Sequence, residues 1–527
     1  MVQKDNYQKN KILIIGIDGG TLDIILPMIK KNKLPTFEKL IKNGSYGKLL
    51  STVPPVTAPA WTSFITGTNP GRHGIFYFFN KDDENSKKRI VSFNNIKTKP
   101  FWRNLNDNGF KVGLVNIPIT YPPDRVDGFI ISGMLVPPEA TDYVYPNSLF
   151  SKLKEYKVDL DGLMEQNEWR AGTLVKRNRD EFIKNVFRLT QSRAENTLKL
   201  MKEMEWDFFM VVFTGSDRIS HFFWEDPSGR NEFSTIIEDY YTMLDTLIAR
   251  LIKETGEETI KLLMSDHGFG SSPKRILNLY VLSKLFQLNL TSLKFWKKYL
   301  TNRILSKIIK NEKLDSIEFL ENDKNIISYH PIYANFFGIG FNNKAENHTE
   351  KNLLIEIKNR ITEKLLEIKD PKTGKKLVQQ VFPRETIYSG PLTDSAPDLI
   401  VQLDYDYIVK FHPARRKLTY DIRDRKKTGE HRVEGLLIAN GPHIIKKKLN
   451  SNISIQDVTP TILYLMNCPI PRRYDGRLIE ELFSKYHIKQ NKPIYEEDGF
   501  NEFLQNDETE IDDFEESKKL LENLGYL

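Results

Sequence analysis

Four short runs of apolar residues alternate with longer polar stretches along the chain. The runs cover Lys11–Ile17, 207–213, Thr259–Met264 and 435–438, and each ends at glycine or polar residues. Continuous apolarity is typical of strands that are covered on both faces, as in a parallel sheet. Between the runs lie helical patterns, most clearly over 174–205. There the apolar positions Phe182, Val186, Leu189, Ala194, Leu198 and Met201 recur at helical spacings. The alternation predicts an α/β fold with a mostly parallel central sheet flanked by helices.

One segment differs from its surroundings. Residues 277–320 mix aromatic residues, leucines and lysines directly after the third apolar run. We interpret this segment as a helical insertion that caps a site. The alternative is a basic amphipathic face that contacts a membrane surface. The predicted organisation is therefore a first part of the core at 1–276, a helical cap insertion at 277–325, a second part of the core at 326–487, and an acidic C-terminal tail with a short helix at 488–527.

Composition narrows the class of protein. The chain has 527 residues, 39% of them hydrophobic and 28% charged, so it is globular rather than disordered. Its apolar runs are much shorter than the ~20 residues that cross a bilayer, and its first residues lack the apolar stretch of a signal peptide. The single cysteine, Cys468, excludes an intrachain disulfide. We therefore expect a cytoplasmic protein without a transmembrane segment.

The charge of the chain is unevenly distributed. The net charge is +7, although residues 495–527 alone hold 12 acidic and 2 basic residues. A basic body favours anionic substrates, but a lysine-rich composition alone does not predict specific nucleic-acid binding.

Aspartate and histidine residues follow the apolar runs. They are Asp18, Asp217, His221, Asp266, His267 and, just before the fourth run, His431. Because ligands bind at the carboxyl edge of open parallel sheets, these side chains can meet in one cleft. Three carboxylates and three imidazoles without a thiolate suit a pair of divalent metal ions, Zn²⁺ in the first place and Mn²⁺ as the alternative. Taken singly, an aspartate at a strand end also suits a helix cap or a turn.

A stretch rich in hydroxyl groups offers a nucleophile for such a site. Residues 54–75 contain the candidates Thr57, Thr62, Ser63, Thr66 and Thr68. Thr57 lies at the predicted start of a helix, because Pro59 suits a first helical turn. There it would face unpaired amide groups that can hold a phosphate. The alternative is that Thr57 is a simple N-cap.

Five motifs occur in an order that resembles a known family. They are DGG at 18–20, TAPAWTSFITGTNPGRHGI at 57–75, DRISH at 217–221, SDHG at 265–268 and GEHR at 429–432. Together they resemble the type I phosphodiesterase/nucleotide pyrophosphatase family of the alkaline phosphatase superfamily, and in particular a soluble branch described as phosphohydrolases or phosphomutases. The resemblance covers roughly residues 11–482 without the insertion, and it implies an alkaline-phosphatase-like core.

The resemblance also assigns roles to residues. It implies that Asp18, Asp266 and His267 bind the metal that also holds Thr57, and that Asp217, His221 and His431 bind the second metal. Thr57 then matches the catalytic nucleophile, which forms a phospho-threonine intermediate. One position departs from the family pattern: Ala60 stands where these enzymes typically carry an asparagine that binds a phosphate oxygen. Candidates to replace it are the Ala58 amide, Asn116 and Arg218.

We therefore predict a metal-dependent phosphohydrolase with two divalent ions, most naturally a phosphodiesterase or pyrophosphatase acting on a small phosphate ester. A phosphomonoesterase or phosphomutase of the same superfamily is the first alternative. A non-catalytic or membrane-surface binding protein built on this fold is the second. The sequence leaves the oligomeric state open.

Overall fold

The computed structural model describes residues 10–81, 88–137, 140–160, 179–225, 234–285, 326–341, 348–423, 427–450 and 452–497. The chain divides into two compact units. The main unit comprises Met1–Ser271 and Lys426–Leu527, and the inserted unit comprises Ser272–Arg425. The two units are described separately below.

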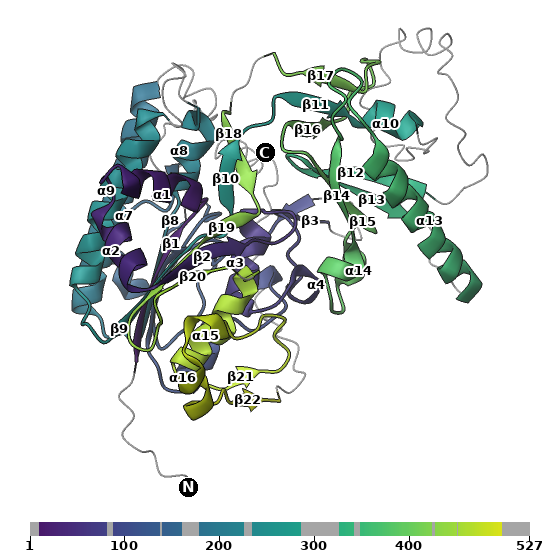
Figure 1. The fold of residues 1–527 in the computed structure, drawn as a ribbon. Coiled ribbons are helices and arrows are strands. Elements are labelled where there is room, and N and C mark those ends of the chain that lie inside the picture. The colour runs from purple at the N-terminus through teal and green to yellow at the C-terminus, as the bar shows by residue number, and fades with distance from the viewer. Residues whose placement is uncertain are drawn as a thin grey trace. The chain divides into compact units, whose positions relative to one another are not determined.

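A nine-stranded sheet forms the centre of the main unit (Figure 1). Its strands, in spatial order, are β20 (Lys447–Leu449), β2 (Ser45–Leu50), β19 (Glu434–Asn440), β9 (Thr259–Met264), β1 (Lys11–Ile17), β8 (Phe208–Phe213), β5 (Val112–Ile117), β6 (Gly128–Ser132) and β7 (Val144–Tyr145). The five strands from β9 to β6 run parallel to one another, whereas the outer neighbours β19 and β7 pair antiparallel with β9 and β6. The predicted α/β fold with a mostly parallel sheet is therefore confirmed.

The apolar runs correspond to the central strands. β8 and β9 are buried along their whole length, and β1 is buried from Ile12 onward, as expected for strands covered on both faces. The fourth run is β19, which pairs antiparallel with both β9 and β2. A continuous apolar run reports burial on both faces but contains no information about strand direction.

Helices cover both faces of this sheet (Figure 1). One layer contains α1 (Leu22–Lys30), α2 (Pro35–Asn43), α7 (Arg179–Glu203), α8 (Gly215–Phe223) and α9 (Thr235–Lys253). The other contains α3 (Thr57–Thr66), α4 (Pro70–His73), α5 (Phe101–Asp107), α15 (Val458–Leu465) and α16 (Lys485–Gln490). The helix predicted over 174–205 is α7 within the described residues, and all six of its predicted apolar positions are buried.

Short two-stranded ladders complete the main unit. They are β10 (Gly268–Ser271) with β18 (Gly429–Arg432), β3 (Phe79–Lys81) with β4 (Lys88–Ile90), and β21 (Ile470–Pro471) with β22 (Tyr495–Glu496). The predicted helix of the acidic tail lies outside the described residues.

The inserted unit has two sheets of its own. The first has the order β16 (Tyr407–Lys410), β11 (Arg275–Asn278) and β17 (Thr419–Asp421). The second has the order β12 (Ile326–Tyr333), β13 (Phe336–Phe341), β15 (Leu399–Leu403) and β14 (Val378–Pro383). The described helices of this unit are α10 (Leu279–Leu285), α13 (His348–Glu367) and α14 (Arg384–Ile387).

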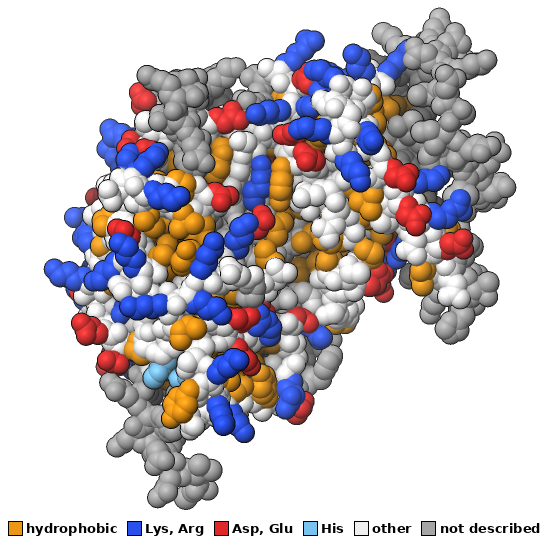
Figure 2. Space-filling view, viewed as in Figure 1, with side chains coloured by type: hydrophobic (Ala, Val, Ile, Leu, Met, Phe, Trp, Pro, Cys, Tyr) orange, Lys and Arg blue, Asp and Glu red, His pale blue; other side chains and the backbone are white. Residues whose placement is uncertain are grey.

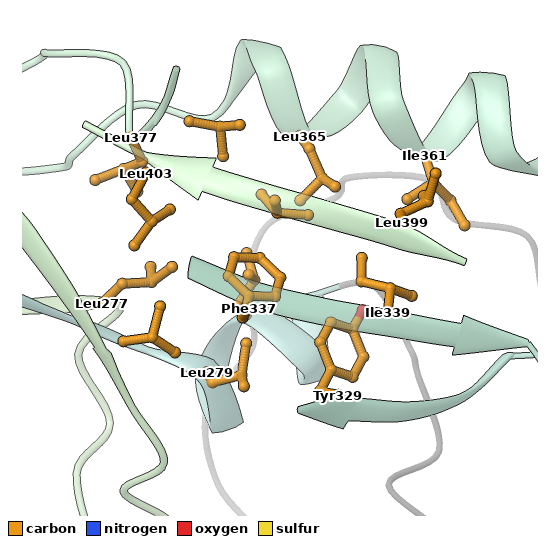
Figure 3. Close-up of a cluster of buried hydrophobic side chains, with 14 of the residues drawn as sticks. Leu277, Leu279, Tyr329, Phe337, Ile339, Ile361, Leu365, Leu377, Leu399 and Leu403 are labelled. Carbon is orange, nitrogen blue, oxygen red and sulfur yellow. The ribbon is translucent and has the colours of Figure 1, made fainter. Parts of the chain in front are cut away.

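A separate hydrophobic core holds the inserted unit together (Figure 3). Ile361 and Leu365 of α13 pack towards Leu399 and Leu403 of β15, and Phe337 of β13 lies in the centre of the cluster. All five side chains are at most 5% exposed. A core of this kind is the mark of a compact folding unit.

The predicted domain boundaries differ from these units. Residues 326–425 were assigned to the core, whereas they belong to the inserted unit, which begins at Ser272. The reason is that short strands of a second sheet resemble those of the first in apolar pattern. Of the predicted cap at 277–325, residues 286–325 lie outside the described residues, so its helical nature stays a prediction. None of the helices in the described ranges combines the length and apolar composition needed to cross a membrane.

Candidate active site

Three neighbouring strands deliver acidic side chains to one edge of the main sheet. Asp18 follows β1, Asp266 follows β9, and Asp217 lies in the first turn of α8, just after β8. Because β9, β1 and β8 are adjacent and parallel, their carboxyl ends meet. His267 lies beyond the end of β9 beside Asp266, so strand alternation does not send the two side chains to opposite faces.

The strand direction of β19 explains how His431 reaches the same edge. β18 pairs antiparallel with β10, which places His431 opposite Phe269. β19 begins two residues after β18 ends and runs antiparallel to β9. Because β19 is antiparallel to β9, the first residues of β19 lie beside the carboxyl end of β9. His431, just before β19, therefore lies close to the side chains that follow β8 and β9.

These side chains form two groups of possible metal ligands. Asp18, Asp266 and His267 form one, and Asp217, His221 and His431 form the other; within each group the ligand atoms lie within 4.8 Å of one another. His431 Nε2 lies 3.1 Å from both Asp217 Oδ1 and His221 Nε2. The grouping matches the one implied by the family resemblance.

A glycine conformation holds the first group in place. Gly19 has a φ of +66°, and its amide donates to Asp266 Oδ1 over 3.2 Å. A Cβ at this position would lie 2.8 Å from the Phe269 ring. Both the left-handed backbone and the close packing therefore require glycine here.

The three histidines are oriented as metal ligands require. Each Nδ1 faces a backbone carbonyl oxygen: His221 faces Gly429 at 3.3 Å, His267 faces Gly268 at 3.0 Å, and His431 faces Pro55 at 3.0 Å. A carbonyl only accepts, so each Nδ1 carries the proton and each Nε2 keeps its lone pair for the cluster. The facing Nε2 atoms of His221 and His431 are both acceptors and need a cation between them or beside them.

The aspartate side chains of the two groups are likewise suited to bind metal ions. Both oxygens of Asp18, Oδ1 of Asp217 and Oδ2 of Asp266 are buried, and no donor of the described residues reaches them with normal hydrogen-bond geometry. Burial raises the pKa of Asp18 and Asp266 well above the usual carboxyl value, and in Asp18 the neighbouring charges of Asp266 and Asp217 add to this rise. Burial also lowers the pKa of His431 to about 4, so its imidazole is neutral at neutral pH. Divalent ions would satisfy these oxygens and nitrogens together.

A buried ion-pair chain supports Asp217 from behind. Arg218 Nη1 donates to Asp217 Oδ2 over 2.9 Å, and Nη2 donates to Asp159 Oδ2 over 2.8 Å. The Arg218 side chain is fully buried. Arg193 in turn donates to the Val158 carbonyl oxygen over 2.6 Å, which anchors the segment that carries Asp159. Oδ2 of Asp217 is thereby occupied, and Oδ1 remains for the metal group.

Sequence reasoning missed Asp159. It stands 59 positions before Arg218, in no recognised motif, and a contact over that distance leaves no local pattern. Arg218 was predicted to bind substrate, a role that stays a prediction. Its described contacts are with Asp217 and Asp159.

We expect Asp159→Asn to weaken metal binding, because Arg218 would lose one of its two carboxylate partners and orient Asp217 less firmly. The loss should be about tenfold to a hundredfold in affinity for one of the two ions, the range found for residues behind a ligand. Competitive titration with a chromogenic chelator measures it. Asp124→Asn is the matched control, since Asp124 is a buried aspartate paired with Arg103 outside both groups. Unchanged affinity in a folded Asp159→Asn protein would contradict the supporting role.

Thr57 is the hydroxyl residue that contacts the first group. It is the first residue of α3 and fully buried, and its Oγ1 lies 3.3 Å from His267 Nε2. The N-cap is Val56, and no side chain caps this helix, so the interpretation of Thr57 as a simple N-cap is wrong. The first amides of α3, including that of Ala58, point out of the helix as donors without a helical acceptor.

The other candidate hydroxyls have structural partners. Thr62 donates to the Ala58 carbonyl oxygen over 2.8 Å, and Thr66 to that of Thr62 over 2.7 Å. Ser63 lies 2.9 Å from His73 Nε2, and Thr68 lies 2.9 Å from Thr66. Their hydrogen bonds serve α3 and its surroundings.

Asn116 sits at the end of β5 with a φ of +60°. Its Nδ2 donates to the Val212 carbonyl oxygen over 2.9 Å, and its buried Oδ1 accepts no hydrogen bond from any residue that the structure describes. Ala58 and Asn116 remain predicted substrate ligands.

Two buried ligand groups at one sheet edge are the arrangement expected of a metal-dependent hydrolase of phosphoric esters. Comparison with protein families agrees, since residues 12–432 match the type I phosphodiesterase / nucleotide pyrophosphatase family. The chain therefore belongs to this family.

Two solved structures are similar to this chain, and the first of them supports the fold. Phosphonoacetate hydrolase from Sinorhizobium meliloti 1021 is similar with a TM-score of 0.51 and 14% identity, over 87% of this chain and 96% of that chain. Human ectonucleotide pyrophosphatase / phosphodiesterase 5 gives a TM-score of 0.49 and 14% identity, over 90% of this chain and 100% of that chain. No protein with a curated function matches the chain in sequence.

Proposed function

We propose that this chain is a phosphodiesterase or pyrophosphatase that acts through a phospho-threonine intermediate on Thr57. The observation that carries the proposal is the Thr57 hydroxyl, which lies 3.3 Å from His267 at the junction of the buried ligand groups and the start of α3.

The chemistry divides into two displacements. In the first, Thr57 Oγ1 forms a bond to phosphorus while the bond to the leaving group breaks, and the proton that the hydroxyl releases is balanced by the one that the departing group takes up. In the second, the oxygen of a water molecule forms a bond to phosphorus, the Oγ1–P bond breaks, Oγ1 takes up a proton from the water, and the phosphoryl product is released. We propose that the amides at the start of α3 donate to phosphoryl oxygens, because a helix N-terminus offers unpaired N–H groups to an anion.

Two divalent ions would be held by Asp18, Asp266 and His267 and by Asp217, His221 and His431. When bound, such ions acidify a hydroxyl and neutralise charge on the transferring group. We propose Zn²⁺, because nitrogen and oxygen ligands without thiolate suit it, and Mn²⁺ is the alternative. The protein's contribution is to fix these side chains: the backbone carbonyls orient the histidines, and Arg218 orients Asp217.

The substrate we propose is a small phosphate ester, without a commitment to nucleotides. The asparagine that family members typically use for a phosphate oxygen is replaced by Ala60, a fully buried residue. A single buried cysteine, Cys468, is compatible with the cytoplasmic location that we also propose.

A substrate panel tests the proposal. We expect the purified protein to hydrolyse bis-p-nitrophenyl phosphate faster than p-nitrophenyl phosphate, with nucleotides and phosphonoacetate as further substrates in the panel. Faster cleavage of the monoester would favour the phosphomonoesterase or phosphomutase alternative. Absence of hydrolysis of every substrate by metal-loaded protein would contradict an enzyme of this class.

A further inference from the structure

The inserted unit contains a second concave site, apart from the residues of the metal groups. A cavity of about 1070 Å³ lies beside β11 and β17, bounded by the chain after β16 and the turn that holds Pro371. Six of its lining residues are basic, namely Arg275, Lys372, Arg415, Arg416, Lys417 and Arg423, and one, Asp421, is acidic. Lys and Arg side chains gather over β11, β16 and β17 (Figure 2).

The floor of this cavity is fixed by a buried network. Arg275 donates to Asp421 over 2.6 Å and to Thr419 over 2.9 Å, and it pairs with Asp370 at 2.8 Å. Asp370 also accepts from Tyr407 over 2.5 Å. Because Arg275 pairs with two carboxylates, its positive charge is largely neutralised within the protein.

The rim carries exposed basic side chains, among them Arg415, Lys417 and Arg423. Asp421, the carboxylate among the described lining residues, already pairs with Arg275 and with Lys372. With Arg416 left out and buried Asp370 included, the five basic and two acidic side chains of the described residues leave an excess of three positive charges. Like charges gathered in a concave surface create a positive potential that attracts anions.

Two features point to phosphate oxygens as the ligand atoms. The Arg415 guanidinium carbon lies over the Tyr420 ring, 4.2 Å from its centre, and this contact restrains a group whose paired N–H donors match phosphate oxygens. The Tyr420 hydroxyl is buried and makes no hydrogen bond within the described part of the chain. It is therefore a donor without an acceptor in the wall of a basic cavity.

We propose that this cavity binds a soluble small molecule that carries clustered phosphate groups. Its volume is close to the upper part of the range of small-molecule sites, about 300–1,000 Å³. Clustered phosphates also occur on lipid headgroups, but none of the exposed large hydrophobic side chains found in the described residues lines this cavity. Membrane-surface sites usually add such side chains to their basic residues.

Binding of inorganic tripolyphosphate to the full-length protein tests the proposal. Isothermal titration at about 0.15 M salt, where surface charges are screened beyond ~8 Å, would compare Lys417→Glu/Arg423→Glu with wild type. The matched control is Lys369→Glu/Lys376→Glu, which changes two exposed lysines of the same unit outside the cavity. All three proteins have the same metal ligands, so any binding of tripolyphosphate at the metal centre contributes equally to the three titrations.

We expect the cavity variant to lose at least about tenfold in affinity, as for the loss of one or two charge-assisted contacts, while the control keeps wild-type affinity. Both variants should hydrolyse a nitrophenyl ester at the wild-type rate. Equal weakening in both variants would overturn the proposal, because it would indicate general charge attraction. Capture by anionic lipid vesicles that depends on Lys417 and Arg423, without binding of tripolyphosphate, would overturn it in favour of a membrane surface.

Discussion

Replacing Thr57 with alanine should abolish nearly all turnover while the protein stays folded and binds its metals. The expected loss is on the order of 10⁶-fold, as for removal of the serine nucleophile of a hydrolase. Thr57→Ser should retain a measurable fraction of the rate, because it keeps the oxygen next to His267. Steady-state hydrolysis of a nitrophenyl diester measures both variants.

The neighbouring hydroxyls provide the controls. Thr62→Ala removes a hydrogen bond to the Ala58 carbonyl inside α3, so its effect should be mild and appear mainly in stability. Acid quenching of the wild-type protein during turnover, followed by phosphopeptide mapping, should place phosphate on Thr57. Phosphate on another residue alone, or near-normal turnover by Thr57→Ala, would refute the mechanism.

Metal content should respond to single ligand changes. Wild-type protein purified without chelator should contain about two divalent ions per chain, and Asp217→Ala or His431→Ala should lose about one of them. Elemental analysis makes the measurement. His73→Gln is the control: His73 is a fully buried histidine whose ring contacts Ser63 and the Ile75 amide outside the ligand groups. Full metal content in both ligand variants would contradict the assignment.

The pH dependence of thermal unfolding gives a second test of metal binding by the two ligand groups. In metal-free protein the raised pKa values of Asp18 and Asp266 mean that the folded state holds protons more tightly than the unfolded state. Their contribution to stability is present below the usual carboxyl pKa and is lost as pH rises through the raised pKa. Higher pH also removes protons that compete with metal. The Tm gap between metal-loaded and chelated protein should therefore widen as pH rises.

Sequence patterns predicted the sheet edge better than its surroundings. β1, β8 and β9 are found by their apolar runs because both faces of each strand are buried, and this burial constrains every position. β5 and β6 were not identified, although they extend the same parallel sheet. The inserted unit's second sheet was likewise missed, since its short strands carry no distinguishing motif.

The candidate site was predicted in its residues but not in its supports. Motifs within a few positions of each other identified Asp217 with His221 and Asp266 with His267, and the family resemblance selected Thr57 among the candidate hydroxyl residues. The carbonyl of Pro55 that orients His431, and the Asp159 carboxylate behind Arg218, are contacts between distant segments. Such pairs depend on tertiary packing, which a local pattern does not record.

The pairing of β10 with β18 couples the completion of the second ligand group to the folding of the inserted unit. Phe269 and His431 are partners in this ladder, and the chain between them passes through the entire inserted unit. Closing so long a loop costs conformational entropy, which grows with the logarithm of the flexible length. Once the inserted unit has folded, that flexible length is far shorter. The second ligand group is thus completed at lower entropic cost after a remote part of the chain has folded, even though no residue of that part belongs to the group.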